Sequence, residues 1–401
     1  MSSPVFIPLV DPKACKPNYP AVLALGFRPF YLLGALWLVL AVPIWMVMYG
    51  HGLITGSHLQ AMDWHGHEML FGFAGAIIVG FLFTAVMNWT NQDTPIGWPL
   101  AGLAAVWIAA RVLLMTGWSE IGAMLDVAFY LLAAAGIARP MLRSGNKRNL
   151  FFIALLTVFA TVSGWQHLAA MGMVGGLDSR ELMQLALSVV TIIVTVITGR
   201  VIPMFTSNAV PGAPVRKLVW LERASVISVI ALALLAVTPV PAALFHVAAL
   251  LAALIHGWRW WNWAPHWTLK KPILWILHAS YLWLPIGFLL KAIPTAWAPM
   301  AGLLSTHALT VGVIGGLCIG MMTRTARGHT GRPLQASSAE VWAYALVLAA
   351  TVFRVLLPLI VPDFYRLWTG ISSLLFISGF AIYVAVFGPW LMQPRVDGRP
   401  G

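Results

Sequence analysis

The sequence has little charge and almost no cysteine. Only 9% of its 401 residues are Asp, Glu, Lys or Arg, whereas 60% are hydrophobic. Soluble domains carry about 25% charged residues, so this composition excludes a soluble globular enzyme and a disordered chain. The two cysteines, Cys15 and Cys318, are too few for a disulfide framework or a four-thiolate metal site.

The motifs of soluble enzymes are also absent. The sequence has no glycine-rich phosphate loop, no Gly-x-Ser-x-Gly elbow and no HExxH zinc motif. The first 25 residues are rich in proline and lack the basic-then-apolar design of a cleaved signal peptide. The net charge of +12 does not indicate a nucleic-acid partner, because basic residues gather in the cytoplasmic loops of membrane proteins. The expected partner is the lipid bilayer.

Long apolar runs cover almost the whole chain, and a membrane-spanning helix needs about 20 such residues. The runs predict twelve helices, at 30–49, 63–88, 97–117, 119–138, 150–172, 180–205, 217–239, 240–258, 270–291, 296–323, 337–359 and 364–390. The break between the seventh and eighth rests on Pro239 and Pro241, so eleven spans are the alternative. We therefore expect an all-α polytopic membrane protein with a cytoplasmic lead-in (1–29), one helix-bundle domain (30–390) and a cytoplasmic tail (391–401).

Basic residues test this topology independently, because they should alternate between loops. The loops on one side hold Arg139, Arg143, Lys147, Arg148, Arg216, Lys217, Arg223, Arg259, Lys270, Lys271, Arg324, Arg327, Arg332, Arg395 and Arg399. The loops on the other side hold only Arg180, Lys291 and Arg366. The alternation favours twelve helices with both termini in the cytoplasm.

Ionisable side chains inside spans are informative, since a bilayer tolerates them only where they pair, face the interior or bind something. One layer, toward the outer face, runs from Asp63 to Glu68 in the second span and includes His307 in the tenth. Helix positions two apart point about 200° apart, so His65 and His67 are not expected to share one ligand, whereas His65 and Glu68 share a face. His65 or His67 together with His307 is the pair that a haem between helices requires.

Small neighbours on these two helices would let a flat macrocycle or another helix approach closely. They are Gly66, Gly72, Gly75, Gly80, Gly312, Gly315 and Gly316. The alternative is tight helix packing, with the histidines hydrogen-bonded to backbone or to Glu68. At similar depth, Arg111 and Asp126 are expected to form a structural ion pair, and His167 is a weaker ligand candidate.

A second layer lies toward the cytoplasmic face. His256 and His278 flank the loop joining the eighth and ninth spans, and two imidazoles there could hold copper or ligate a second haem. Arginines near the same face suit haem propionates or another anion through bidentate contacts. These basic candidates are Arg28, Arg200, Arg324, Arg327 and His329. Topology alone also accounts for arginines on this side.

Several segments resemble the signature segments of the NnrS family. They are residues 27–30 (FRPF), 64–69 (WHGHEM), 80–85 (GFLFTA), 88–90 (NWT), 199–206 (GRVIPMFT), 307–312 (HALTVG) and 327–332 (RGHTGR). The resemblance runs from the first span to the loop after the tenth. It implies a polytopic protein of the bacterial inner membrane that contains haem and copper. It also implies a role in nitric oxide metabolism, denitrification and resistance to nitrosative stress.

A fainter similarity connects the chain with the haem–copper oxidase and nitric oxide reductase superfamily. His65 followed by Met69 and Gly80 is similar to its haem-ligand helix, and His307 before Gly312 is similar to a later one. The paired adjacent histidines of that superfamily's copper site are absent, and the sixth span contributes Arg200 instead. Oxygen reduction is therefore not inferred.

The leading hypothesis is a protein that holds one or two b-type haems and binds or processes nitric oxide with an unknown electron donor. His65 and His307 form the first axial pair, and the cofactor is also expected to contact His67, Arg28, Arg200 and Arg324. The remaining metal candidates, for a second haem or copper, are His67, His256, His278 and His329. If the protein is an enzyme, it is a haem oxidoreductase. The alternatives are a secondary transporter and a haem-linked sensor or assembly factor without turnover.

Overall fold

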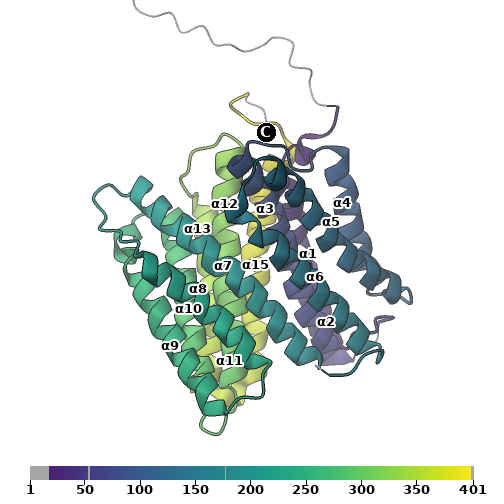
Figure 1. The fold of residues 1–401 in the computed structure, drawn as a ribbon, viewed down its shortest axis with the longest axis vertical. Helices are drawn as coiled ribbons and strands as arrows, with labels where there is room; N and C mark the ends of the chain where they lie inside the picture. Colours follow the sequence, from purple (N-terminus) through teal and green to yellow (C-terminus); the bar gives the residue numbers. More distant parts are fainter. Residues whose placement is uncertain (1–17, 53–54, 177, 399–401) are drawn as a thin grey trace, which may run out of the picture.

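The computed structural model describes residues 18–52, 55–176 and 178–398, and every structural statement below concerns these residues. Their regular elements are all helices (Figure 1). Eleven of them are long and apolar enough to cross a membrane. The all-α polytopic fold is thereby confirmed, while Cys15 and most of the expected lead-in lie outside the described residues.

Several spans are built from two or three consecutive helical segments. In chain order the long elements are α1 (Phe27–His51), α2 (Ala61–His67) continued by η2 (Glu68–Ala74) and α3 (Gly75–Thr90), α4 (Trp98–Leu113), α5 (Ser119–Arg143), α6 (Phe151–Ala170), α7 (Ser179–Ala209), α8 (Val219–Ala236), α9 (Ala242–Trp261), α10 (Pro272–Lys291), α11 (Ala301–His307) continued by η5 (Ala308–Gly315) and α12 (Gly316–His329), α13 (Ser338–Thr351) continued by η6 (Val352–Leu356) and α14 (Leu357–Ile360), and α15 (Tyr365–Met392). Short 3-10 turns are η1 (Ala21–Leu23), η3 (Lys147–Asn149), η4 (Pro265–Thr268) and η7 (Pro362–Phe364).

The expected twelve helices are present, with one shorter than the rest. The α4 helix has 16 residues, which at 1.5 Å per residue is about 24 Å, less than the thickness of a bilayer core. The break expected near Pro239 and Pro241 is confirmed, since α8 ends at Ala236 and α9 begins after Pro241. Proline has no backbone N–H to donate, so it suits the position before a helix rather than its interior.

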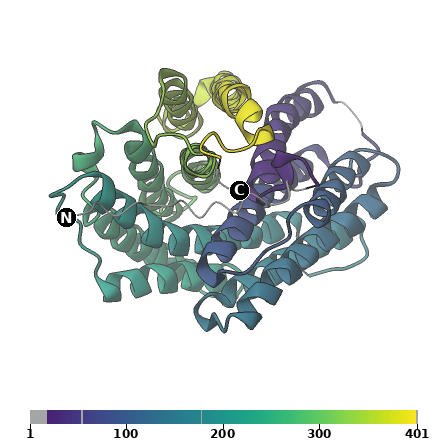
Figure 2. The ribbon, with the colours of Figure 1, turned by 90° about the horizontal axis from the view of Figure 1, so that it is seen from above.

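The bundle places the second and tenth spans at its centre. Helices adjacent in sequence pack together from α4 to α10, and α15 returns to pack against α1 (Figures 1 and 2). In its most apolar window, the span Ala61–Thr90 is 78% buried, against 28% for α8 and for α9. His67 of this span is fully buried, whereas His65 is half-buried.

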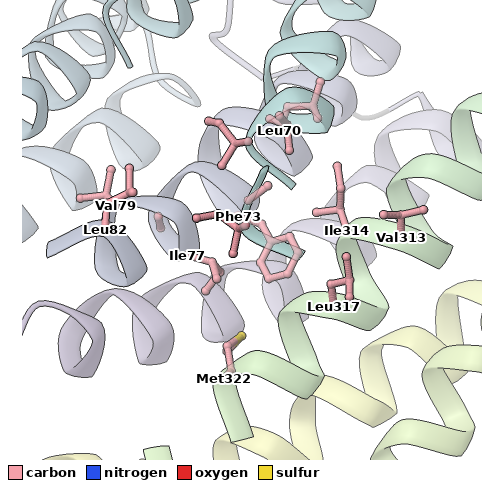
Figure 3. Packing of buried hydrophobic residues seen from close by; sticks show 14 of the residues in the cluster. Leu70, Phe73, Ile77, Val79, Leu82, Val313, Ile314, Leu317 and Met322 are labelled. Carbon is pink, nitrogen blue, oxygen red and sulfur yellow. The ribbon is translucent and has the colours of Figure 1, made fainter. Parts of the chain in front are cut away.

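Apolar side chains join the two central spans. Phe73 and Ile77 of the second span lie near Ile314 and Leu317 of the tenth in one buried cluster (Figure 3). The amino-terminal ends of both spans, α2 and α11, lie at the same end of the bundle (Figure 1). This packing brings the outer candidate histidines to one end of the molecule.

Three segments have π-helical geometry, in which the backbone bonds span five residues instead of four. η2 begins directly after His67, η5 directly after His307, and η6 contains Arg354. Such segments are rare and occur frequently at functional sites. All three therefore coincide with ionisable side chains inside spans.

Both described ends of the chain lie at the other end of the bundle. η1 packs against α15, and the backbone N–H of Val396 donates to the carbonyl of Thr330. This arrangement agrees with an even number of crossings. That this end faces the cytoplasm stays a prediction from the charge of the loops.

Candidate metal centre

Three buried side chains from three helices converge near the end of the bundle opposite the described chain ends. They are His67 at the end of α2, Asp126 in α5 and His167 in α6, each at most 2% exposed. One ligand atom from each lies within 4.8 Å of the other two. Ligands bound to one metal ion at 2.0–2.2 Å stand roughly 3–4 Å apart, so this spacing fits a single ion.

The two imidazoles direct nitrogen atoms without a hydrogen-bond partner toward the same carboxylate oxygen. His67 Nε2 lies 3.4 Å and His167 Nε2 lies 3.8 Å from Asp126 Oδ2. Both Nε2 atoms are buried and lack a hydrogen bond. Buried polar atoms in native proteins are rarely unpartnered, and those that are need an explanation such as a bound ion.

The adjacent carboxylate fixes the tautomer of His67. Its Nδ1 lies 3.0 Å from Glu68 Oε1, and an ionised carboxylate can only accept, so the imidazole proton sits on Nδ1. The lone pair of Nε2 then faces the Asp126 carboxylate, an arrangement that is repulsive unless a cation lies between them. A histidine that donates one N–H to a carboxylate and offers its other nitrogen is the common arrangement of a metal ligand.

Glu68 is itself held by two donors from other helices. Its Oε2 accepts from Trp37 Nε1 at 2.7 Å and from Arg111 NH1 at 2.9 Å. The same guanidinium forms an ion pair with Asp126 through NH2, which confirms the ion pair expected from the sequence. Arg111 thus fixes the two carboxylates relative to each other.

The charges of this group do not cancel. Asp126 also accepts a hydrogen bond of 2.5 Å from Ser163 Oγ, which adds no charge. Two carboxylates and one guanidinium, with neutral imidazoles, leave one net negative charge in a buried site. An uncompensated buried charge is strongly unfavourable, so the group calls for a cation.

A third histidine orients His167 from the loop before α2. His58 Nε2 lies 2.9 Å from His167 Nδ1, and His58 Nδ1 lies 2.9 Å from Ser119 Oγ. Burial lowers the pKa of His58 below its ordinary value, and the nearby His67 lowers it further. A neutral His58 can accept the Nδ1 proton of His167, which leaves the His167 Nε2 lone pair free for a metal. His58 also lines an adjacent cavity of about 460 Å³.

His65 points away from this centre, as its spacing from His67 predicted. Its ring stacks on Trp45 with a centroid distance of 4.1 Å, and it interacts electrostatically with Arg354 and His307. The structure therefore brings His65 and His307 into one neighbourhood. Glu68, which the spacing places on the same helix face as His65, contacts His67, Trp37 and Arg111.

The glycines of the two central spans are covered by protein side chains. A Cβ on Gly72 would meet Trp37, one on Gly312 would meet Trp283, and one on Gly315 would meet Phe376. Gly75 leaves room for Tyr130, whose hydroxyl donates to the carbonyl of Phe71. At these positions the small residues serve tight helix packing, the alternative considered above.

The two histidines of the inner layer are held separately. His256 Nδ1 lies 2.7 Å from the hydroxyl of Tyr281, whereas His278 Nε2 lies 2.9 Å from Thr206 Oγ1. Within the described residues, the three-ligand cluster contains neither of them. His278 Nδ1 is buried and unpartnered, so a role for it alone stays a prediction.

The inner basic residues have individual partners. Arg200 donates to Asn149 Oδ1 at 2.6 Å, and Arg28 donates to the carbonyls of Leu391 and Gln393. The Arg324 guanidinium lies 3.7 Å from the ring centroid of Phe205, and His329 packs on Phe27. Arg200 and His329 line one cavity of about 280 Å³.

Sequence reasoning missed part of the centre. The sequence assigns Asp126 only to an ion pair, makes His167 a weaker candidate and offers no candidate in the loop that holds His58. The available signal was depth, because the predicted topology puts all three toward the outer face with His67. Their convergence depends on how α5 and α6 are rotated, which the uniformly apolar faces of these helices do not specify.

Comparison with known proteins gives one match. A family model described as NnrS protein matches residues 21–395, which is nearly the whole chain. No curated protein matches the sequence.

Proposed function

The chain belongs to the NnrS protein family, and on that premise we propose that it is a metal-dependent membrane protein that binds nitric oxide. The observation that carries the proposal is the pair of buried, unpartnered Nε2 atoms of His67 and His167 facing Asp126. We place the protein in the bacterial inner membrane, with its metal centre toward the outer face.

His67, His167 and Asp126 would hold the metal, and two imidazoles with a carboxylate suit copper and iron. A metal bound by three protein ligands would supply an open coordination position for a small neutral ligand. Glu68 and His58 orient the two imidazoles, and Arg111 holds both carboxylates in place.

The wall beside the centre is apolar. The ring of Phe71 lies 4.9 Å from that of His67 and 4.4 Å from that of Phe159, measured between centroids. An uncharged gas dissolves in hydrocarbon, so it can reach such a site from the bilayer without a polar channel. The surroundings therefore favour a small neutral ligand over a charged one.

We also propose haem b, held by His65 and His307, as the alternative to the arrangement in which Arg354 donates to His307. The donor set fits in part, since His307 Nδ1 donates to the carbonyl of Leu303 and presents Nε2 as a lone pair. That lone pair now accepts a hydrogen bond of 3.0 Å from Arg354 NH2, so haem ligation requires Arg354 to move. An absorption spectrum of the purified protein, oxidised and dithionite-reduced, tests for haem.

The metal proposal is tested on detergent-purified protein by elemental analysis followed by titration with nitric oxide. We expect about one copper or iron per chain and a spectroscopic change when nitric oxide is added. His67→Ala and His167→Ala should each lose the metal and the response. His246→Ala is the matched control, because His246 lies in α9, outside the centre, and its side chain hydrogen-bonds to the Lys291 carbonyl. A full metal content in both centre variants, or a metal-free wild type from metal-replete cells, would overturn the proposal.

A further inference from the structure

Arg354 carries a buried positive charge near His65. It lies on the opposite side of the His65–His67 helix turn from the metal centre. Arg354 in η6 is 7% exposed, and its guanidinium lies 5.1 Å from the ring centroid of Tyr365. It hydrogen-bonds to Tyr365 and, through NH2, to His307 Nε2, and its other charged or polar neighbours are Tyr49 and His65. No carboxylate forms an ion pair with it within the described part of the chain. A guanidinium buried in a membrane protein without a counter-charge is strongly unfavourable.

Two polar atoms in this group have no partner. Arg354 NH1 and His65 Nδ1 are both buried and make no hydrogen bond. The nitrogen atoms of His307 are both used, since Arg354 NH2 donates to His307 Nε2 while His307 Nδ1 donates to the Leu303 carbonyl. His307 is therefore a neutral acceptor that orients the guanidinium. The NH1 group remains as an unused donor, and His65 Nδ1 can serve as a second one.

We propose that Arg354, together with His65, binds a planar, singly charged oxyanion. An arginine presents its donors in a flat fork that matches two oxygens on one central atom. Nitrite, nitrate and carboxylates share this shape and charge. A spherical halide offers no such match, so the site discriminates by geometry as well as by charge.

The charge of this oxyanion site complements that of the metal centre. His65 and His67 are two residues apart on one helix turn and point in different directions. His65 faces the net positive group around Arg354, and His67 faces the net negative group of the metal centre. An anion on one side and a cation on the other would each neutralise a buried charge. The proposal does not depend on metal binding, because the Arg354 group contains none of the three proposed metal ligands.

The test is calorimetric titration of the full-length protein in detergent with sodium nitrite, nitrate, acetate and chloride at constant ionic strength, together with melting curves. We expect saturable binding of the planar anions and a rise in melting temperature with their concentration, because a ligand that binds only the folded state stabilises it. Chloride should bind at least tenfold more weakly. Stronger binding of nitrite than of acetate identifies a nitrogen oxyanion, and equal binding identifies carboxylates as equally good ligands.

Arg354→Gln should abolish the response, whereas Arg143→Gln, an exposed control at the far end of α5 from the metal centre, should retain it. If Arg354→Gln does not fold, Arg354→Lys keeps the charge without the planar fork and should weaken nitrite binding about tenfold or more. The proposal is overturned if the wild type binds none of the planar anions or if chloride binds as tightly. It is also overturned if Arg354→Lys responds like the wild type, or if the purified protein carries a haem that His307→Ala removes.

Discussion

His67 Nε2 lies 3.4 Å from Asp126 Oδ2, and the proton that could have joined them is held on Nδ1 by Glu68. A lone pair facing a carboxylate in a buried site is unfavourable unless a metal ion or a second imidazole proton lies between the two groups. This relationship distinguishes the centre from an ordinary buried histidine, whose nitrogen atoms are hydrogen-bonded. The local charges thus favour a bound cation, and the following variants test the proposed metal binding.

Asp126→Asn should lower metal affinity at least tenfold, because it removes the ligand charge while keeping the side-chain shape. Metal content after dialysis against a chelator measures the effect. Asp363→Asn, an exposed residue in the loop before α15, is the control and should retain the metal. Equal retention by Asp126→Asn would mean that the carboxylate is not a ligand.

Glu68→Gln should weaken metal binding about 10–100-fold, the usual cost of losing the partner that orients a ligating histidine. The charge of Glu68 increases the basicity of His67 and fixes its tautomer through the 3.0 Å contact. The dissociation constant, measured by competition with a coloured chelator, is the readout. An unchanged constant would show that Glu68 serves only its ion pair with Arg111.

Removing the metal should lower the melting temperature of the wild type. Bound metal stabilises the folded state in proportion to the logarithm of its concentration, provided that it binds the unfolded chain weakly. His167→Ala should melt at the same temperature with and without added metal. A wild type that is insensitive to chelation would contradict a metal at this site.

The sequence predicted the fold well because each span carries its own signal. The apolar runs and the alternation of basic loops predict the number of helices in the described structure. The break at Pro241 coincides with the start of α9. The divergence of His65 from His67 also followed from helix geometry. These features are local, so residue spacing was enough to predict them.

The candidate site was harder to predict because it depends on relations between helices. His167 approaches His67 only through the packing of α6 beside α5, and His58 joins them from a loop. No spacing rule indicates where a helix changes to π geometry, so the three π segments could not be predicted from the sequence.

Gly75→Ala should destabilise the protein by about 1–3 kcal/mol, because an added methyl group would overlap the hydroxyl of Tyr130. That hydroxyl donates to the carbonyl of Phe71 within η2. The melting temperature is the measurement. In the double variant with Tyr130→Phe the overlap is relieved, and part of the stability should return; identical losses in both variants would show that the hydroxyl is not the obstacle.

Glu340→Gln should destabilise the fold by about 3–5 kcal/mol without changing metal content, because it leaves the Arg327 guanidinium buried and uncompensated. Glu340 accepts from Arg327 Nε at 2.8 Å and from NH2 at 2.5 Å, and it also accepts from the backbone N–H of Ser337 at the start of α13. Glu120→Gln, at an exposed position, is the matched control and should change the melting temperature little. Because this ion pair lies on the opposite end of the bundle from His67, a loss of metal in Glu340→Gln would mean that the two ends of the bundle unfold as one unit. A loss of stability alone would assign the pair a purely structural role.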